Sequence, residues 1–341
     1  MWFRVAALVF AALCVLRSGA AQDTYTYTPL ISGGVGFFTS TNGGNTTYQP
    51  HIEPQITAPI TPRLFIESRA ILLESFFPNG SQGYEHSHAA SFIYLQGDYL
   101  ATSHVTVVGG SFLLPFNTYN DRLSPIWIGN FQDAPLNVGI GTLGTGTGLG
   151  GMLSGSAIAR RRFSISYNAW FSARSGNMQF NSERSSGGRV SLYLPEKRLE
   201  VGGSYDRSLQ DKQENFLGAY AWWEPANTAF RLRSEYARGQ HAQGYWVEAD
   251  YRTKAFGGLD SWAGRLEPVF RVQQTFRIDN VASDGVPSVN TQRVDFGIDY
   301  NLPHNTRILT SYSRQFSARQ NVNIWETGIV YRFLFPTWKS K

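Results

Sequence analysis

The feature that most constrains the fold of this chain is an alternation of apolar and polar residues over short segments. In residues 161–173, Phe163, Ile165, Tyr167 and Phe171 fall on one face, and mainly serine, asparagine and arginine residues fall between them. Successive side chains of a β-strand point to opposite faces of the sheet, so a period of two predicts a strand with one apolar face. The pattern recurs along the chain, which predicts an all-β protein.

Sixteen segments of the chain show features of a strand. They lie near residues 30–40, 48–60, 63–76, 86–99, 103–114, 146–158, 161–174, 187–195, 197–209, 214–223, 228–239, 243–254, 263–278, 290–301, 305–317 and 322–335. An even number of strands is typical of an antiparallel barrel built from one bacterial outer-membrane chain. The sequence therefore predicts a 16-stranded antiparallel transmembrane β-barrel, with residues 22–341 forming one domain.

The connections between the predicted strands fall into two classes. Short connections lie at residues 61–63, 101–103, 159–161, 195–197, 224–227 and 302–305. Longer segments, rich in glycine, asparagine and serine, lie at residues 41–47, 78–85, 175–187 and 280–290. Brief periplasmic turns and longer outer loops are typical of outer-membrane barrels. We therefore expect the longer segments at the outer mouth.

The first residues of the chain predict export. Met1–Arg4 precedes an apolar run over residues 5–16, and small residues follow at 18–21. This order is the layout of a cleaved secretory signal peptide, to which we assign residues 1–21. Cys14 is the only cysteine in the chain, so the mature protein would contain no disulfide and no thiolate metal site.

Composition agrees with a membrane barrel. Mean hydropathy is −0.25, too polar for a helical membrane protein, yet aromatic residues make up 14% of the chain. After the predicted signal peptide, no apolar run approaches the roughly 18 residues of a membrane-spanning helix. A barrel accounts for these facts because only every second strand residue faces lipid. The net charge of +5 is not gathered in a Lys/Arg block, so we expect outer-membrane lipid, and no nucleic acid, as a partner.

The final predicted strand ends in aromatic residues. Trp325, Ile329 and Tyr331 share one face of residues 324–335. An aromatic-ended last strand resembles the insertion signal that the barrel-assembly machinery reads, which makes that machinery an expected partner. Residues 336–341 follow the last aromatic strand residue, so the ending departs from the usual pattern.

The longest predicted connection, about residues 115–146, is the main candidate for a functional element. Loops this long in compact folds are usually functional, and in a wide barrel such a loop can fold into the lumen. We predict that it constricts the pore; the alternative is a loop that caps the barrel or contacts a neighbouring subunit. Its candidate pore residues are Tyr119, Asp121, Arg122 and Asp133. The loop also contains apolar residues that must pack against a partner surface, namely Leu123, Ile126, Trp127 and Ile128.

The start of this loop carries a family resemblance. Residues 109–125 resemble a segment of porins related to the phosphate-selective porins O and P, in which a strand leads into Pro-Phe-Gly-x-Tyr-Asn-Glu-Arg-x-x-Pro. This chain has Asn117 in place of the glycine and Asp121 in place of the glutamate. Residues 188–196 with 199–205, and residues 234–239 with 244–247, resemble the same family. The resemblance implies a sixteen-stranded, trimeric channel, but it does not extend to a residue-by-residue match of an anion ladder.

Charged residues on the polar faces of the later strands are candidate pore-lining groups, because charge on the lipid face costs about 2–4 kcal/mol near the membrane midplane. The candidates are Arg231, Arg233, Glu235, Glu248, Asp250, Arg252, Arg271, Arg293, Asp295 and Arg332. One interpretation is a charge-lined path with a weak anion preference. The other is a salt-bridged barrel lining without a role in selectivity.

We therefore predict a bacterial outer-membrane porin for passive diffusion of small hydrophilic solutes or anions, as a homotrimer without cofactor. The alternatives are a substrate-preferring channel for phosphate or sugars, an outer-membrane hydrolase and a secreted soluble β-protein. A hydrolase would need rim Ser, His or Asp groups in a defined geometry, which sequence cannot supply. His86 and His88 share a face but lack a third ligand there, and the glycine-rich residues 139–151 lack the helix of a dinucleotide site. No catalytic residue and no metal ligand is predicted.

Overall fold

The computed structural model describes residues 28–80, 83–138, 143–210, 213–253, 258, 261–279 and 284–336. The predicted signal peptide, residues 1–21, lies outside the described residues, as does the tail after residue 336. In the described part of the chain, no helix combines the length and the apolar character needed to cross a bilayer.

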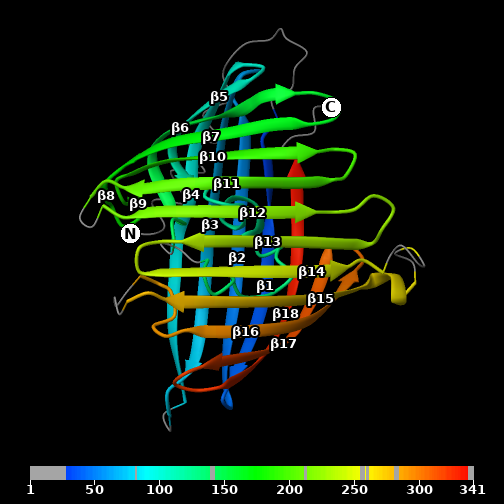
Figure 1. Cartoon of the computed structure of the whole chain (residues 1–341). Coiled ribbons are helices and arrows are strands. Elements are labelled where there is room, and N and C mark those ends of the chain that lie inside the picture. Colours follow the sequence, from blue (N-terminus) through cyan, green and yellow to red (C-terminus); the bar gives the residue numbers. More distant parts are fainter. Residues whose placement is uncertain are drawn as a thin grey trace, which may run out of the picture.

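The described strands close into a single antiparallel barrel of sixteen strands. Its strands are β1 (Leu30–Asn42), β2 (Asn45–Pro59), β3 (Leu64–Pro78), β4 (Tyr84–Thr102), β5 (Val105–Leu113), β6 (Thr147–Ala159), β7 (Ser164–Ala173), β10 (Ser185–Leu194), β11 (Leu199–Ser208), β12 (Asn215–Trp223), β13 (Phe230–Arg238), β14 (Ala242–Tyr251), β15 (Leu266–Arg277), β16 (Thr291–Leu302), β17 (Thr306–Ser317) and β18 (Val322–Pro336). Each strand pairs with its neighbours along the chain, and β1 closes the barrel by pairing with β18 (Figure 1).

All sixteen predicted strands are confirmed. The largest difference in length is at β4, which continues to Tyr84 and Thr102 beyond the predicted residues 86–99. It is longer because β3 stays paired with it as far as Pro78 opposite Tyr84, across a register shift between Arg69 and Ala70.

The outward positions of the strands form an apolar belt. Phe296 on β16 is 51% exposed, whereas its neighbour Asp295 is 0% exposed. The same alternation exposes Trp325 and buries Glu326 on β18. Other large apolar side chains exposed on the outside are Val35, Phe37, Ile52, Leu72, Phe171, Val190, Leu217 and Ile329. A soluble barrel would not expose so large an apolar surface, so the belt is the lipid-facing surface of a transmembrane barrel.

One predicted loop is wrong. Residues 41–47 were expected as a longer polar loop, but β1 and β2 pair up to Asn42 opposite Asn45. Only Gly43 and Gly44 connect them, with φ of 58° and 85°. A two-residue hairpin turn with both φ values positive favours glycine, and the polar residues around it belong to the ladder.

The connections that the sequence predicted to be short lie together at one end of the barrel, here called the turn end, and the opposite end is called the loop end. The turn end also carries the longer β14–β15 connection, with the short 3₁₀ turn η3 (Ala263–Arg265), and the loop end also carries the two-residue turn Gly43–Gly44. At the loop end, β8 (Ser175–Gly176) and β9 (Asn181–Ser182) form a small separate hairpin between β7 and β10.

Candidate functional site

The connection between β5 and β6, residues 114–146, is called the inner loop. Its backbone reaches strands that are not neighbours of β5 or β6: the Ile126 N–H donates to Glu53 Oε2 of β2 at 3.3 Å, and Arg307 of β17 donates to the Gly129 carbonyl. Because these strands lie well around the circumference from β5 and β6, the loop crosses the barrel interior.

A buried glutamate of β13 holds the first turn of the inner loop. Glu235 Oε1 accepts hydrogen bonds from the Thr118 N–H at 2.7 Å, the Thr118 hydroxyl at 2.6 Å and the Tyr119 N–H at 2.7 Å. Its other oxygen accepts from the Trp246 indole at 3.3 Å. Hydrogen bonds to an ionised acceptor are stronger than neutral ones, so Glu235 positions the single π-helical turn η2 (Tyr119–Leu123) that follows.

Asn117 turns the chain into this position. Its φ is 56°, in the left-handed region that asparagine adopts more readily than most residues. The resembled porin motif has glycine here, which suits the same backbone conformation. On β12, Gly218 leaves the space that the Asn117 side chain occupies, since a Cβ at Gly218 would lie 2.3 Å from Asn117 Oδ1.

The next two charged residues of the loop pair with the neighbouring wall. The Asp121 carboxylate accepts hydrogen bonds from both Nη atoms of Arg189 on β10, at 3.2 and 2.9 Å. Arg122 donates to Glu200 of β11 at 2.9 Å. Bidentate arginine–carboxylate pairs fix orientation as well as distance, so these pairs hold η2 against β10 and β11.

Asp133 of the inner loop pairs with a different part of the wall, formed by β15 and β16. It accepts hydrogen bonds from Arg271 of β15 at 3.2 Å and from Arg293 of β16. Behind it, Asp295 accepts from Arg271 Nε at 2.8 Å and from Gln273 at 2.6 Å. Arg271 is 1% exposed and Asp295 is 0% exposed. Buried charges of this kind are tolerated when paired, and here the pairing includes the loop.

The structure places the ten predicted pore-lining residues in two groups. Seven are 5% exposed or less and lie on the interior face of β13 to β16, and we call them the charged wall: Arg233, Glu235, Glu248, Asp250, Arg271, Arg293 and Asp295. The other three, Arg231, Arg252 and Arg332, are more exposed and line a cavity at the turn end. That these ten residues line the pore remains a prediction.

A second interior surface received no role from the sequence. It consists of half-buried residues on β6 and β7, here called the hydroxyl wall: Ser154, Ser156, Ser164, Ser166 and Asn168. Asn168 donates to Ser154 at 2.9 Å. Within the described residues, none of the five forms a hydrogen bond with the inner loop. The strict alternation of small polar residues in 164–168 was the signal that could have identified it.

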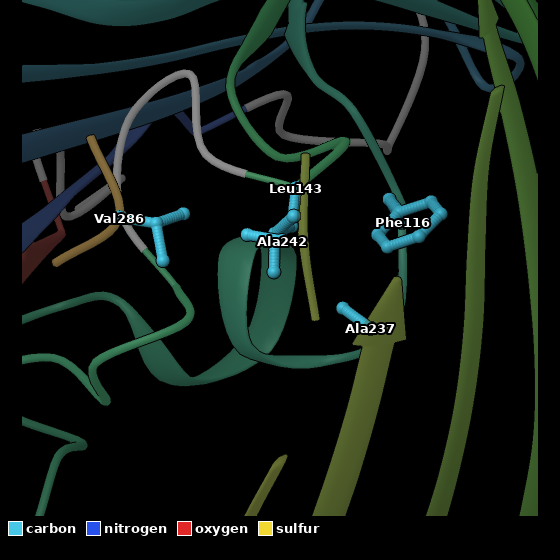
Figure 2. Close-up of a cluster of buried hydrophobic side chains, with 5 residues drawn as sticks. All are labelled: Phe116, Leu143, Ala237, Ala242 and Val286. Atoms are coloured by element: carbon cyan, nitrogen blue, oxygen red, sulfur yellow. The ribbon is translucent and has the colours of Figure 1, made fainter. Parts of the chain in front are cut away.

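Apolar side chains hold both ends of the inner loop. Phe116 and Leu143, near its two ends, are buried with Ala237 and Ala242 of the barrel wall and Val286 of the β15–β16 connection. Figure 2 shows these five side chains directed toward a shared region beside the wall. The loop is therefore packed at its base as well as ion-paired at its centre.

The apolar residues in the middle of the loop also pack, as predicted. Leu123 contacts Val138 and Trp246 in one cluster. Ile126 and Trp127 pack against a second cluster of interior side chains, namely Phe38, Leu309 and Val330. Ile128 is the exception and stays 37% exposed.

Polar contacts also connect the loops at the loop end. His241 lies 3.0 Å from Glu214 and 2.7 Å from Asp279. Asp284 accepts two hydrogen bonds of 2.5 Å from Arg277, the last residue of β15. Partial burial acts to raise the pKa of Asp284, but the hydrogen bonds from Arg277 and from the Val286 N–H outweigh it, so this pKa is lowered.

Comparison with known proteins identifies the fold. No protein-family model matches the sequence, and no curated protein matches it either. Among solved structures, Salmonella typhi OmpF in complex with daunomycin has a TM-score of 0.60 and 12% identity, covering 92% of this chain and 100% of that chain. The anion-selective porin from Comamonas acidovorans has a TM-score of 0.55 and 11% identity, covering 89% and 98%. OmpTdeltaL8, a loop deletion mutant of an outer-membrane protein of Vibrio cholerae, has a TM-score of 0.56 and 10% identity, covering 90% and 99%.

Identities this low establish a shared fold only. The fold is that of solved bacterial outer-membrane barrels, and it is nearly complete in both directions of the comparison. A closed barrel has no free sheet edge in lipid, which is the requirement for a membrane-spanning β-sheet. Together with the apolar belt, this places the protein in a bacterial outer membrane.

Proposed function

We propose that the protein is a porin, which lets small hydrophilic solutes diffuse passively across the outer membrane. The observation that carries this proposal is a polar barrel interior crossed by a loop that is fixed on several sides. Barrels of sixteen strands are wide enough to leave an aqueous channel. Here a cavity of about 420 Å³ opens at the loop end and one of about 680 Å³ at the turn end.

We further propose that Tyr119, Asp121, Arg122 and Asp133 set the width of the pore by fixing the inner loop. All four contact wall residues, through Trp246, Arg189, Glu200 and the Arg271–Arg293 pair respectively. The open path would then run between the loop and the hydroxyl wall. Neutral hydroxyl and amide groups would form hydrogen bonds with many solutes and would not discriminate strongly between solutes of different charge.

The proposed preference is a weak one for anions. It rests on the exposed arginines at the turn end and on the resemblance of residues 109–125 to the phosphate-selective porins O and P. The structurally similar anion-selective porin from Comamonas acidovorans is in line with it. We also propose export by a signal peptide of residues 1–21, insertion by the barrel-assembly machinery and assembly as a homotrimer.

Purified protein in planar bilayers tests the proposal. Discrete conductance steps are expected, with a reversal potential in a salt gradient that indicates a weak preference for anions. A gel-shift control, in which unheated and boiled samples migrate differently in detergent, establishes that the barrel is folded. Folded, inserted protein without conductance steps would contradict the porin function, and a clear cation preference would contradict the charge assignment alone.

A further inference from the structure

The cavity at the turn end has an unusual concentration of arginine. Its volume is about 680 Å³, within the roughly 300–1,000 Å³ range of small-molecule sites. Five guanidinium groups from four segments line it: Arg231, Arg252, Arg265, Arg307 and Arg332. Among the described residues that line it, Glu267 is the only carboxylate. This described lining therefore has more guanidinium groups than carboxylates.

The arginines differ in how they are paired. Arg231 has close partners, with Asp250 at 2.6 Å and Glu267 at 3.3 Å. Arg252 has only long pairs, the shortest of them to Glu224 at 3.7 Å. Arg307 lies 3.6 Å from the buried Asp299 and donates to the Gly129 carbonyl. Pairing within the protein therefore differs from one arginine of the cavity to the next.

Arg332 is the least compensated of the five. It is exposed, and in the described part of the chain its side chain has no ion pair or hydrogen bond. Its register partner on β1 is Gly34, which has no side chain. On the other side, Arg307 lies at the position paired with Val330, two residues before Arg332 on the same interior face. The two arginines therefore occupy neighbouring positions of the interior face, and of the two only Arg307 has a partner in the described residues, at Asp299.

An apolar surface adjoins these charges. Trp127 of the inner loop packs against the buried Val330 and also lines the cavity. Ile128 lines it as well and is 37% exposed. The cavity thus presents guanidinium forks next to an aromatic ring and an aliphatic side chain. Ligand sites typically combine such apolar surface with a few convergent charged groups.

We propose that this cavity is a binding site for organic carboxylates that carry a compact apolar group, with Arg332 as the principal anion contact. A guanidinium binds a carboxylate through two parallel hydrogen bonds, and the apolar group would lie against Trp127 and Ile128. That such anions also cross the membrane rests on the proposed porin function, whereas the binding does not.

Equilibrium dialysis of radiolabelled benzoate against the full-length barrel in detergent tests the binding. Saturable binding is expected, with acetate and benzyl alcohol competing poorly because each lacks one half of benzoate. Arg332→Gln is expected to weaken the binding of benzoate at least about tenfold, because it removes hydrogen bonds between two charged groups. Arg332→Lys keeps the charge but loses the two parallel donors of the guanidinium. Its affinity for benzoate is expected to lie between those of the unsubstituted protein and of Arg332→Gln.

Arg319→Gln is the matched control, because Arg319 is an exposed arginine of the β17–β18 connection at the opposite end. It removes the same charge and should leave benzoate affinity unchanged. Absence of benzoate binding, or equal weakening by Arg319→Gln and Arg332→Gln, would overturn the site. Equal affinity for acetate and benzoate would overturn its apolar part. The gel-shift assay identifies variants that fail to fold, and bilayer conductance separately tests the porin function.

Discussion

The charged wall and the hydroxyl wall lie on different sectors of the same barrel, yet their side chains are in opposite states. On the charged wall, Arg271 and Asp295 are almost completely buried and paired, partly with the inner loop. On the hydroxyl wall, Ser154 and Asn168 are half-buried and hydrogen-bond to each other. The difference teaches that the density of charge along a strand does not identify the more exposed part of the barrel interior.

The physical reason is that a loop inside a barrel needs strong partners of its own. Its backbone groups leave water when the loop folds inward, and unpaired buried polar groups are costly. Carboxylates and guanidinium groups of the wall supply the partners, as Glu235 does for Thr118 and Tyr119. Once engaged in this way they are covered, whereas the side chains of the hydroxyl wall stay half-buried.

The largest expected effect is on stability. Arg271→Ala removes one of the two arginine partners of Asp295 and of Asp133, and it removes a guanidinium that lies 4.3 Å from the centroid of the Phe131 ring. Loss of one member of a buried ion pair costs about 3–5 kcal/mol. We expect the free energy of unfolding, measured by urea titration in lipid vesicles, to fall by about 3 kcal/mol. Ser166→Ala on the hydroxyl wall should lower it by about 1 kcal/mol or less.

Equal destabilisation by the two substitutions would remove the distinction between the walls. It would mean that the contacts of Arg271 contribute no more to stability than those of Ser166, so that water can replace either set.

A smaller effect is expected on the mobility of the inner loop. Glu235→Ala leaves the donors of Thr118 and Tyr119 without their acceptor. A cost of about 2 kcal/mol corresponds to roughly a 30-fold increase in the detached state. Hydrogen–deuterium exchange of the peptide 116–124 should therefore accelerate by at least about tenfold. Glu67→Ala, which removes an interior glutamate of β3, is the control and should leave this peptide unchanged.

The smallest effect concerns the loop end of β15, where Arg277 pairs with Asp284. Because the pKa of Asp284 is lowered in the folded protein, its contribution is present above the ordinary carboxyl pKa and is lost as the pH falls through the lowered value. Asp284→Asn removes this dependence. Pepsin cleavage within 284–290 should be about threefold faster in the variant near pH 4 and similar in both proteins near pH 2. Identical profiles at all pH values would show that the pair does not hold the loop.

Much of the fold was predictable because strand periodicity depends on local sequence. Alternation around Phe163 and Tyr167 identified β7, and the final strand was predicted within a residue of its observed bounds, Val322–Pro336. The loop at 41–47 was mispredicted because Asn42 and Asn45 are polar in both a loop and a ladder. Local composition does not distinguish the two.

The site was predictable only in part, because its contacts join residues far apart in sequence. The family resemblance and the loop length pointed to Asp121 and Asp133, and the structure gives both of them arginine partners. Alternation also placed Arg271 and Asp295 on the polar face. It could not show that the loop covers them, since that depends on the path of the inner loop across the barrel.

The most direct test compares the two walls by cysteine modification. In protein that begins at residue 22, which contains no cysteine, Ser154→Cys lies on the hydroxyl wall and Ser313→Cys lies on β17 beside Arg293, where Ser313 is fully buried. Single channels are recorded while a charged methanethiosulfonate reagent is added. The account predicts a stepwise loss of current for Ser154→Cys and no change for Ser313→Cys. Block of Ser313→Cys with Ser154→Cys unaffected would contradict it.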